Sequence, residues 1–231
     1  MKKIFGFIAF VALLFSCNKN EQGSMVVKVT IDGLKKGTLY LQKVKDTALV
    51  SVDSIKLDGN TNILLSDDVE SPELYFLTLD KIAGERISFF GEEGEITIQA
   101  KLEKFATSAK ITGSVNQDLL TEHKVMAQKF NDKKLDLLVE KFNANKINDT
   151  ALVSKLEKEE KSLIKRKYYY TTNFAVVNAT HEVAPYLALT ELFDANIRLL
   201  DTINNSLSKE VKASKYGKEL ERFIKDIKKA P

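Results

Sequence analysis

The only cysteine in the sequence, Cys17, is the residue whose type and position most clearly predict a chemical modification. It follows Leu14-Phe15-Ser16 at the end of a short apolar segment, which two lysines precede. A thiol placed there, after a small residue, is typical of a bacterial lipoprotein signal, whose cysteine is lipidated and becomes the mature N-terminus. Two or three acyl chains then hold a protein at a membrane. We therefore expect residues 1–16 to be removed, and residues 17–24 to form the lipidated cysteine and a polar tether.

The apolar part of this segment covers residues 4–15, which is short of the roughly 20 residues that a membrane-spanning helix needs. The alternative is a plain secretory signal with an incidental cysteine, which would place a small-x-small site before the cut. Removing the segment takes away two lysines and no acid, so the formal charge falls from +3 to +1. A nearly neutral chain offers no electrostatic basis for binding nucleic acid, and we expect no nucleic-acid partner.

A single cysteine excludes an intramolecular disulfide, a CxxC redox pair and a cysteine-ligated zinc site within this sequence. His123 and His181 are the only histidines, so a multi-histidine metal site is impossible. We expect His123 to be a partly buried helix residue and His181 to lie near a helix start. The sequence has no G-x-S-x-G motif and no glycine-rich phosphate loop. We therefore predict no catalytic residue, no cofactor and no metal site.

Two acidic groups, Asp67-Asp68-x-Glu70 and Glu92-Glu93-x-Glu95, could in principle supply oxygen ligands for calcium. Neither follows the spacing of a dedicated calcium loop, and both lie where strands are expected to turn. We interpret them as solvated turn residues. A glycosidase-like pair of carboxylates remains an alternative, and it would make the protein a hydrolase or glycan-processing enzyme with a pocket between two halves.

Three adjacent aromatic residues, Tyr168-Tyr169-Tyr170, cannot all face one side of a helix. We expect Tyr170 to lie in a seam between helices and one neighbour to pack against the β-domain. The remaining ring would then belong to a binding surface, where aromatics with a polar tip are favoured. The lysines near this stretch are interpreted as a solvated face: Lys161, Lys165 and Lys167.

The elements that position these residues differ between the two halves of the chain. Residues 25–113 contain short runs of alternating apolar residues, broken by glycines and acidic pairs, which predicts about eight consecutive antiparallel strands. Their spacing indicates a β-sandwich or an open barrel. The expected strands cover residues 25–31, 38–42, 48–57, 62–65, 74–79, 86–90, 95–99 and 109–112.

Residues 114–231 are predicted to be α-helical, because apolar residues there recur at three, four and seven positions. The fold class is therefore α+β. Two long helices should form an antiparallel hairpin, with a seam of Leu119, Met126, Phe130 and Leu137 on the first and Leu156, Leu163, Tyr170 and Val177 on the second. A last helix should be capped by Ser214 and carry a stripe of Tyr216, Leu220, Phe223 and Ile227. The expected helices cover residues 115–143, 150–177, 182–193, 195–207 and the segment after Ser214.

Several of these segments, in this order and spacing, are shared with one family. The chain resembles the N-terminal domain of unknown function of Bacteroidetes lipoproteins that carry a TlpA-type thiol–disulfide oxidoreductase, a thioredoxin-like, AhpC/TSA-related enzyme. The resemblance covers nearly all of the mature chain, and it departs at Asn60-Thr61-Asn62-Ile63, where relatives usually place a basic and an aromatic residue. The segments that carry it are Ile31-Asp32-Gly33, Gly37-Thr38-Leu39-Tyr40-Leu41, Val52-Asp53-Ser54-Ile55, Asp58-Gly59, Pro72-Glu73-Leu74, residues 89–98, Ile111-Thr112-Gly113-Ser114-x-Asn116 and Ser214-x-Tyr216-Gly217-Lys218.

This resemblance implies a location and an architecture but no activity, because the CxxC-bearing domain of those relatives would begin where this sequence ends. We expect a non-catalytic envelope lipoprotein that binds another protein or a ligand. A sharper version is an accessory to a separate thioredoxin-like enzyme, docked at an uncovered apolar patch near Phe223 and Ile227. The anchor implies a membrane partner, and the resemblance implies the outer membrane. Because the segment after Cys17 has a single acid, Glu21, we expect the periplasmic face.

Overall fold

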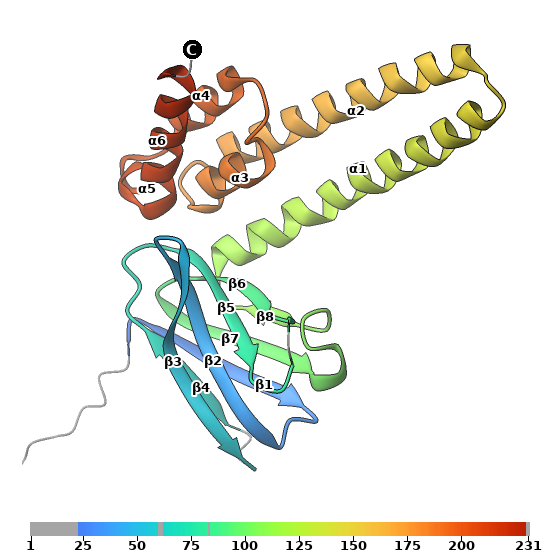
Figure 1. Ribbon diagram of the computed structural model, residues 1–231. Coiled ribbons are helices and arrows are strands. Elements are labelled where there is room, and N and C mark those ends of the chain that lie inside the picture. Colours follow the sequence, from blue (N-terminus) through green and yellow to red (C-terminus); the bar gives the residue numbers. More distant parts are fainter. Residues whose placement is uncertain (1–22, 60–61, 83, 230–231) are drawn as a thin grey trace, which may run out of the picture.

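A computed structural model describes residues 23–59, 62–82 and 84–229 of the chain (Figure 1). Cys17, the predicted signal and most of the predicted tether lie outside the described residues. Strands come first and helices follow, so the predicted α+β fold is confirmed. The described strands are β1 (Met25–Asp32), β2 (Lys36–Lys45), β3 (Ala48–Asp58), β4 (Ile63–Asp67), β5 (Glu73–Leu79), β6 (Ile87–Gly91), β7 (Gly94–Lys101) and β8 (Lys110–Thr112).

These strands form two four-stranded sheets, one in the order β4-β1-β7-β8 and the other in the order β3-β2-β5-β6. The apolar side chains that alternate along β1 point into a common core with those of β2, β5 and β7. Met25, Val27 and Leu41 are fully buried there. A period of two in the sequence therefore gives each strand one buried face, as expected for a sandwich of two sheets.

One strand pair differs from the predicted run of antiparallel neighbours. β1 pairs with β7 in parallel, with Met25 opposite Gly94 and Asp32 opposite Lys101. Strand alternation in the sequence reports which side chains are buried, but it contains no information on which strand lies beside which. The pairing arises because β7 crosses back from the second sheet and lies beside the first strand.

Strand β6 separates two apolar cores. Phe89 faces the core between the sheets, whereas its neighbour Phe90 faces the helices on the other side. Both side chains are fully buried, because residues of α1, α3 and α6 pack against Phe90 on the outer side of β6. This double burial explains why two adjacent residues of β6 are both apolar, which interrupts the strict alternation of the strand.

The helices begin directly after β8. The hydroxyl oxygen of Ser114 accepts a hydrogen bond from the Gln117 amide at 3.1 Å and caps the first helix, and Asp149 caps the second through the Leu152 amide at 2.9 Å. The first two helices form a long antiparallel hairpin that projects from the body of the molecule (Figure 1). The described helices are a 3₁₀ turn (Leu102–Lys104), α1 (Val115–Lys146), α2 (Thr150–Val177), α3 (Val183–Glu191), α4 (Ile197–Ser206), α5 (Lys209–Ala213) and α6 (Lys215–Lys229).

The predicted hairpin seam is only partly right. Leu137, Leu156 and Leu163 are buried in the hairpin core, but Val177 is 83% exposed. An α-helix drifts by about 20° per heptad relative to a strict seven-residue repeat. By the end of α2 the buried face has therefore moved to Phe174 and its neighbours.

The helices differ from the prediction in two further ways, in the buried positions of α1 and in one additional short helix. Leu119 and Met126 were expected in the seam, but the fully buried positions of α1 lie one residue later, at Leu120 and Ala127. The short helix α5 precedes α6 and was not expected. Ser214 nevertheless caps α6, because its hydroxyl accepts a hydrogen bond from the Gly217 amide at 3.4 Å. The core of the last helices is formed by residues such as Leu200, Ile203 and Leu220.

Candidate functional site

The β-sandwich and the helices share a small apolar core where they meet. Phe90 of β6 packs edge-on against Tyr186 of α3 and Tyr216 of α6, with ring centroids 5.2 and 6.1 Å apart. Leu120 of α1 and Leu187 of α3 belong to the same buried cluster. Because elements from both halves contribute to one packed core, the two halves hold each other in a defined position.

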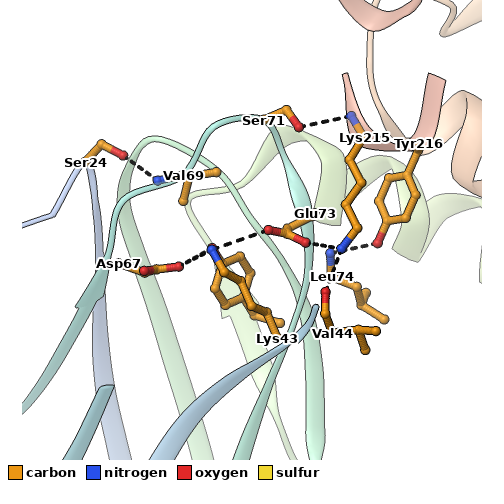
Figure 2. A network of polar contacts seen from close by, with 11 residues as sticks. Ser24, Lys43, Val44, Asp67, Val69, Ser71, Glu73, Leu74, Lys215 and Tyr216 are labelled. Carbon is orange, nitrogen blue, oxygen red and sulfur yellow. Dashed lines mark hydrogen bonds and ion pairs between the residues drawn. The ribbon is translucent and has the colours of Figure 1, made fainter. Parts of the chain in front are cut away.

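A row of charged side chains runs along this junction, as Figure 2 shows. The ammonium of Lys43 in β2 lies 2.6 Å from a carboxylate oxygen of Asp67 and 3.5 Å from one of Glu73. The hydroxyl of Tyr75 donates a hydrogen bond of 2.7 Å to the same oxygen of Asp67. Lys215 of α6 contacts the second oxygen of Glu73. Glu73 is therefore held between a lysine of the sheet and a lysine of the helices.

The start of α6 is also bound to backbone groups of the sheet. The ammonium of Lys215 donates to the carbonyl oxygen of Val44 at 2.8 Å, and its amide donates to the hydroxyl of Ser71 at 3.3 Å. The hydroxyl of Tyr216 accepts a hydrogen bond of 3.0 Å from the Leu74 amide. The order of residues at the start of α6 thus fixes both the position and the rotation of this helix on the sheet.

Protonation states in this network follow from burial and neighbouring charge. Burial by itself would lower the pKa of Lys43, but Asp67 and Glu73 outweigh that effect and raise it. Burial, and then the hydrogen bond to Asp67, raises the pKa of Tyr75 far above its usual range. Lys43 therefore stays an ammonium and Tyr75 a neutral donor at physiological pH. The groups satisfy one another and provide no free general base.

A pocket of about 670 Å³ opens beside this network, between the β2–β3 turn, β5 and α6. Phe76 forms part of its apolar wall, and the guanidinium of Arg86 stacks over the Phe76 ring with its carbon 4.7 Å from the centroid. Asp46 occupies the two-residue turn with a φ of 56°, a conformation that aspartate tolerates. The lining residues are Val44, Asp46, Thr47, Leu74, Phe76, Lys215, Tyr216, Glu219 and Arg222.

A second polar contact connects the turn before β7 with α1 and α3. The two carboxylate oxygens of Glu92 accept hydrogen bonds from the Val115 amide and from the side-chain amide of Asn116, the latter at 2.6 Å. The same Asn116 nitrogen lies 3.5 Å from Glu182, and the Asn116 oxygen accepts from the Val183 amide at 2.9 Å. Burial, reinforced by the charge of Glu92, raises the pKa of Glu182. Two carboxylates thus meet around one asparagine at the base of α1.

The acidic groups singled out from the sequence do not behave alike. The prediction of solvated turn residues was wrong for Asp67 and Glu92, which are half-buried and bind groups from other elements. Asp68 is exposed, and its carboxylate accepts a hydrogen bond of 3.0 Å from the Ser24 amide. Glu70, like the other members of the two groups, is exposed. No group of three or more potential metal ligands gathers within residues 23–59, 62–82 and 84–229.

The three tyrosines of α2 face different surroundings. Tyr170 is half-buried at the hairpin seam and stacks on His123, with ring centroids 5.5 Å apart. Tyr168 packs against the core of the C-terminal helices and donates a hydrogen bond of 2.7 Å to Asp194. The expectation that a neighbour of Tyr170 packs against the β-domain was therefore wrong. Tyr169 is 48% exposed, which leaves its ring available for binding.

Phe223 and Ile227 are half-buried and pack against the core of the C-terminal helices. Four exposed apolar side chains lie on one face of α1, and sequence reasoning missed them. They recur at i, i+3, i+4 and i+7, the spacing of one helix face. These exposed side chains are Leu135, Leu138, Val139 and Phe142.

The two histidines take part in contacts within and between helices. His123 is fully buried, and its Nε2 lies 3.0 Å from the hydroxyl of Thr171 in α2. Burial lowers its pKa, so the ring is neutral near pH 7. His181 lies just before α3, where its carbonyl accepts a hydrogen bond from the Ala184 amide. His123 is thus more deeply buried than expected, whereas the expected position of His181 is confirmed.

Within the described part of the chain, every helix is too short or too polar to cross a membrane. Residues 25–120 match the family "Domain of unknown function (DUF4369)". The matched segment ends inside α1, just after the turn in which Gln117 and Leu120 contact β6. The DUF4369 region therefore includes the helical turn that closes the junction. No curated protein matches the chain.

Proposed function

We propose that this protein is a non-catalytic, lipid-anchored protein of the cell envelope that works by binding a segment of a partner protein. The observation that carries the proposal is the pocket between the sheet and α6, whose walls come from both halves of the chain. The charged groups that hold this junction satisfy one another, so they support the pocket and do not supply reactive groups. The anchor at Cys17 and the periplasmic face of the outer membrane are parts of the same proposal.

The chemistry of the pocket favours a peptide segment as the ligand. Phe76 and Leu74 provide apolar surface, and Arg222 and Glu219 on α6 provide one charge of each sign. A lining of mixed charge suits a chain with an apolar side chain and its own polar backbone, whereas nucleic acid would require a basic surface. The resemblance to TlpA-type lipoproteins supports a thioredoxin-like thiol–disulfide oxidoreductase as the partner.

Site-specific crosslinking in cells tests this proposal directly. A photoreactive amino acid at Thr47, which is exposed at the pocket, should trap the partner. The same group at Lys155, an exposed position on the distant part of α2, is the matched control. Both chains should also be made with Cys17→Ala, which removes the proposed anchor.

Mass spectrometry of the crosslinked bands then decides between outcomes. A CxxC-bearing protein captured at Thr47 and absent at Lys155, with a yield that falls in the Cys17→Ala chain, supports an anchored accessory of envelope redox chemistry. A different protein captured at Thr47 alone retains the pocket as a binding site and overturns the thioredoxin-like partner. Equal capture from both positions, or none, overturns the pocket as the binding site.

The alternative is a hydrolase or glycan-processing enzyme, and one observation favours it. Glu92 and Glu182 both contact Asn116, and the pKa of Glu182 is raised, as general acids often require. The hydrogen bonds to both oxygens of Glu92 argue for a structural contact instead. A hydrolytic activity on envelope glycans that disappears in both Glu92→Gln and Glu182→Gln, with folding retained, would establish the enzyme and displace our proposal.

A further inference from the structure

A second hollow lies between α2 and α4, away from the junction pocket. Its volume is about 570 Å³. Three of the side chains that line it are cations, and none is an acid. The lining residues are Lys161, Ile164, Lys165, Tyr168, Tyr169, Asn196, Arg198 and Leu199.

The three cations of this hollow, Lys161, Lys165 and Arg198, form no ion pair with any described residue. Two acids near them in the sequence have other partners. Glu160 pairs with Lys141 at 2.8 Å, and Asp201 with Lys228 at 2.7 Å. The lining of the hollow therefore has a net positive charge, and the nearby acid Asp194, which binds the Tyr168 hydroxyl, lies outside that lining.

The arrangement of the two lysines is unfavourable for the helix itself. Lys161 and Lys165 are four residues apart on α2, so their charges are neighbours on one helix face, where like charges destabilise a helix. Arg198 reaches the same hollow from α4. Cations from two separate elements that converge on one hollow are the usual arrangement for binding an anion.

The remaining lining residues provide apolar surface beside the cations. Ile164 and Leu199 contribute aliphatic side chains. The hydroxyl of Tyr168 is engaged by Asp194, which fixes the direction of its ring. Tyr169 is half-exposed, and the ammonium of Lys165 lies 5.6 Å from the centroid of its ring. A ligand in this hollow would therefore meet a cation and a half-exposed aromatic ring next to each other.

We propose that the hollow between α2 and α4 binds a phosphate-bearing ligand, with the phosphate on Lys161, Lys165 and Arg198 and the rest of the ligand against Tyr169 and Leu199. Phosphate carries up to two charges and several acceptor oxygens, which match one planar guanidinium and two ammonium groups better than a single carboxylate does. The phosphate can belong to a soluble sugar phosphate or to a phospholipid headgroup. This site is separate from the pocket at the junction and does not depend on the partner proposed there.

Titration of the purified mature chain (residues 17–231) with three probes tests the site, and the chain carries Cys17→Ala so that the proposed acyl anchor does not itself bind vesicles. The probes are inorganic phosphate, glucose 6-phosphate, and vesicles of phosphatidylcholine with and without phosphatidylglycerol. Calorimetry suits the first two and vesicle flotation the third. We expect glucose 6-phosphate or the phosphatidylglycerol vesicles to bind more tightly than inorganic phosphate, because each adds contacts to the phosphate. Binding should weaken as salt is raised.

Two triple variants separate a built site from general surface charge. Lys161→Gln/Lys165→Gln/Arg198→Gln should weaken binding at least tenfold. The control removes the same number of exposed cations outside the hollow: Lys129→Gln/Lys133→Gln/Arg166→Gln. It should change the affinity less than twofold. Binding of the sugar phosphate alone identifies a soluble ligand, and binding of the anionic vesicles alone identifies a headgroup. Equal losses in both variants, or no binding of any probe, overturn the proposal.

Discussion

Lys215, the first residue of α6, contacts the carboxylate of Glu73, the first residue of β5, across 142 positions of sequence. The side chain of Glu73 is only 11% exposed, and Lys43 approaches its other oxygen. The Glu73 carboxylate is costly to desolvate, whereas Lys215 is 31% exposed, so the main effect of their contact is to select one arrangement of the two halves over others. The junction pocket depends on that arrangement, because Lys215 and Tyr216 form one of its walls.

Removing the helix side of this pair should destabilise the protein. In Lys215→Met, Glu73 loses its closest cation, and the Val44 carbonyl loses a donor. We expect the free energy of unfolding to fall by about 1–3 kcal/mol, the usual cost of leaving a buried polar group unsatisfied. Chemical denaturation monitored by circular dichroism measures this loss.

Lys225→Met is the matched control on the same helix. Lys225 pairs with Glu221 one turn away, and both side chains are more than half exposed. Such surface pairs contribute little to stability, so this variant should unfold like the wild type. If both variants lost the same stability, the effect would belong to α6 in general and not to the contact with Glu73.

The backbone at Gly217 of α6 leaves no room for a side chain. A Cβ there would collide with the backbone carbonyl oxygen of Val211 in α5, which cannot move independently of its helix. We expect Gly217→Ala to cost about 3 kcal/mol, in the range of overpacked core substitutions. Lys218→Ala, at the next and exposed position, should be nearly neutral. Thermal unfolding of the two variants compares them directly.

Because of His123, we expect the free energy of unfolding to decrease as the pH is lowered below neutrality. Burial lowers the pKa of this ring in the folded state below its usual value of 6.5, with smaller effects from Glu191, Lys167 and Lys124. Below about pH 6.5 the unfolded state binds a proton that the folded state does not, so unfolding becomes easier as the pH falls. His123→Gln removes the titrating group and keeps a partner for Thr171.

The measurement is the free energy of unfolding between pH 5 and 7.5. The decline toward low pH should be shallower in His123→Gln than in the wild type. The same profile for His181→Gln gives the contribution of the other histidine. A decline that is equally steep in His123→Gln would contradict the assignment to this ring.

The spacing of apolar residues predicted the helices and strands well, because a strand or helix that is buried on one face places its apolar residues at the period of that element. The runs around Val27 and Ile98, with a period of two, gave strands at their observed positions, and the polar break near Asn148 ended the first long helix. The parallel pairing of β1 with β7 could not be predicted, because it depends on where the chain returns after β6. The prediction that Val177 lies in the hairpin seam was wrong, because the strict seven-residue repeat was extended to the end of α2, where the buried face of the helix has rotated away.

The candidate site could not be predicted from the sequence for a similar reason, because its residues are far apart along the chain. Lys43, Glu73 and Lys215 are ordinary charged residues in the sequence, and only folding brings them together. Asp67 was noticed, but as a member of an acidic turn, because its partner in β2 lies 24 positions away. The tyrosines of α2 were the exception, since adjacency on a helix alone requires that at least one of them faces outward.

The last prediction concerns Glu182 and has the opposite pH dependence to that of His123. Burial raises the pKa of this carboxyl in the folded state, and the nearby charge of Glu92 adds to the effect, whereas Asn116 and His181 act against it. Above about pH 4.5 the unfolded state releases the proton more easily than the folded state, so this group favours unfolding as the pH rises. Glu182→Gln should therefore gain stability relative to the wild type, and the gain should grow between pH 4 and pH 7.

Glu93→Gln is the matched control, because it removes one acid from an exposed position on the turn that also holds Glu92. Comparing the two variants separates the burial of Glu182 from a general reduction of negative charge. If Glu182→Gln instead lost stability at pH 7, the ionised carboxylate would have to stabilise the junction through Asn116. The pair with Glu92 would then be a contact that the fold depends on, and the case for Glu182 as a proton donor would fall with it.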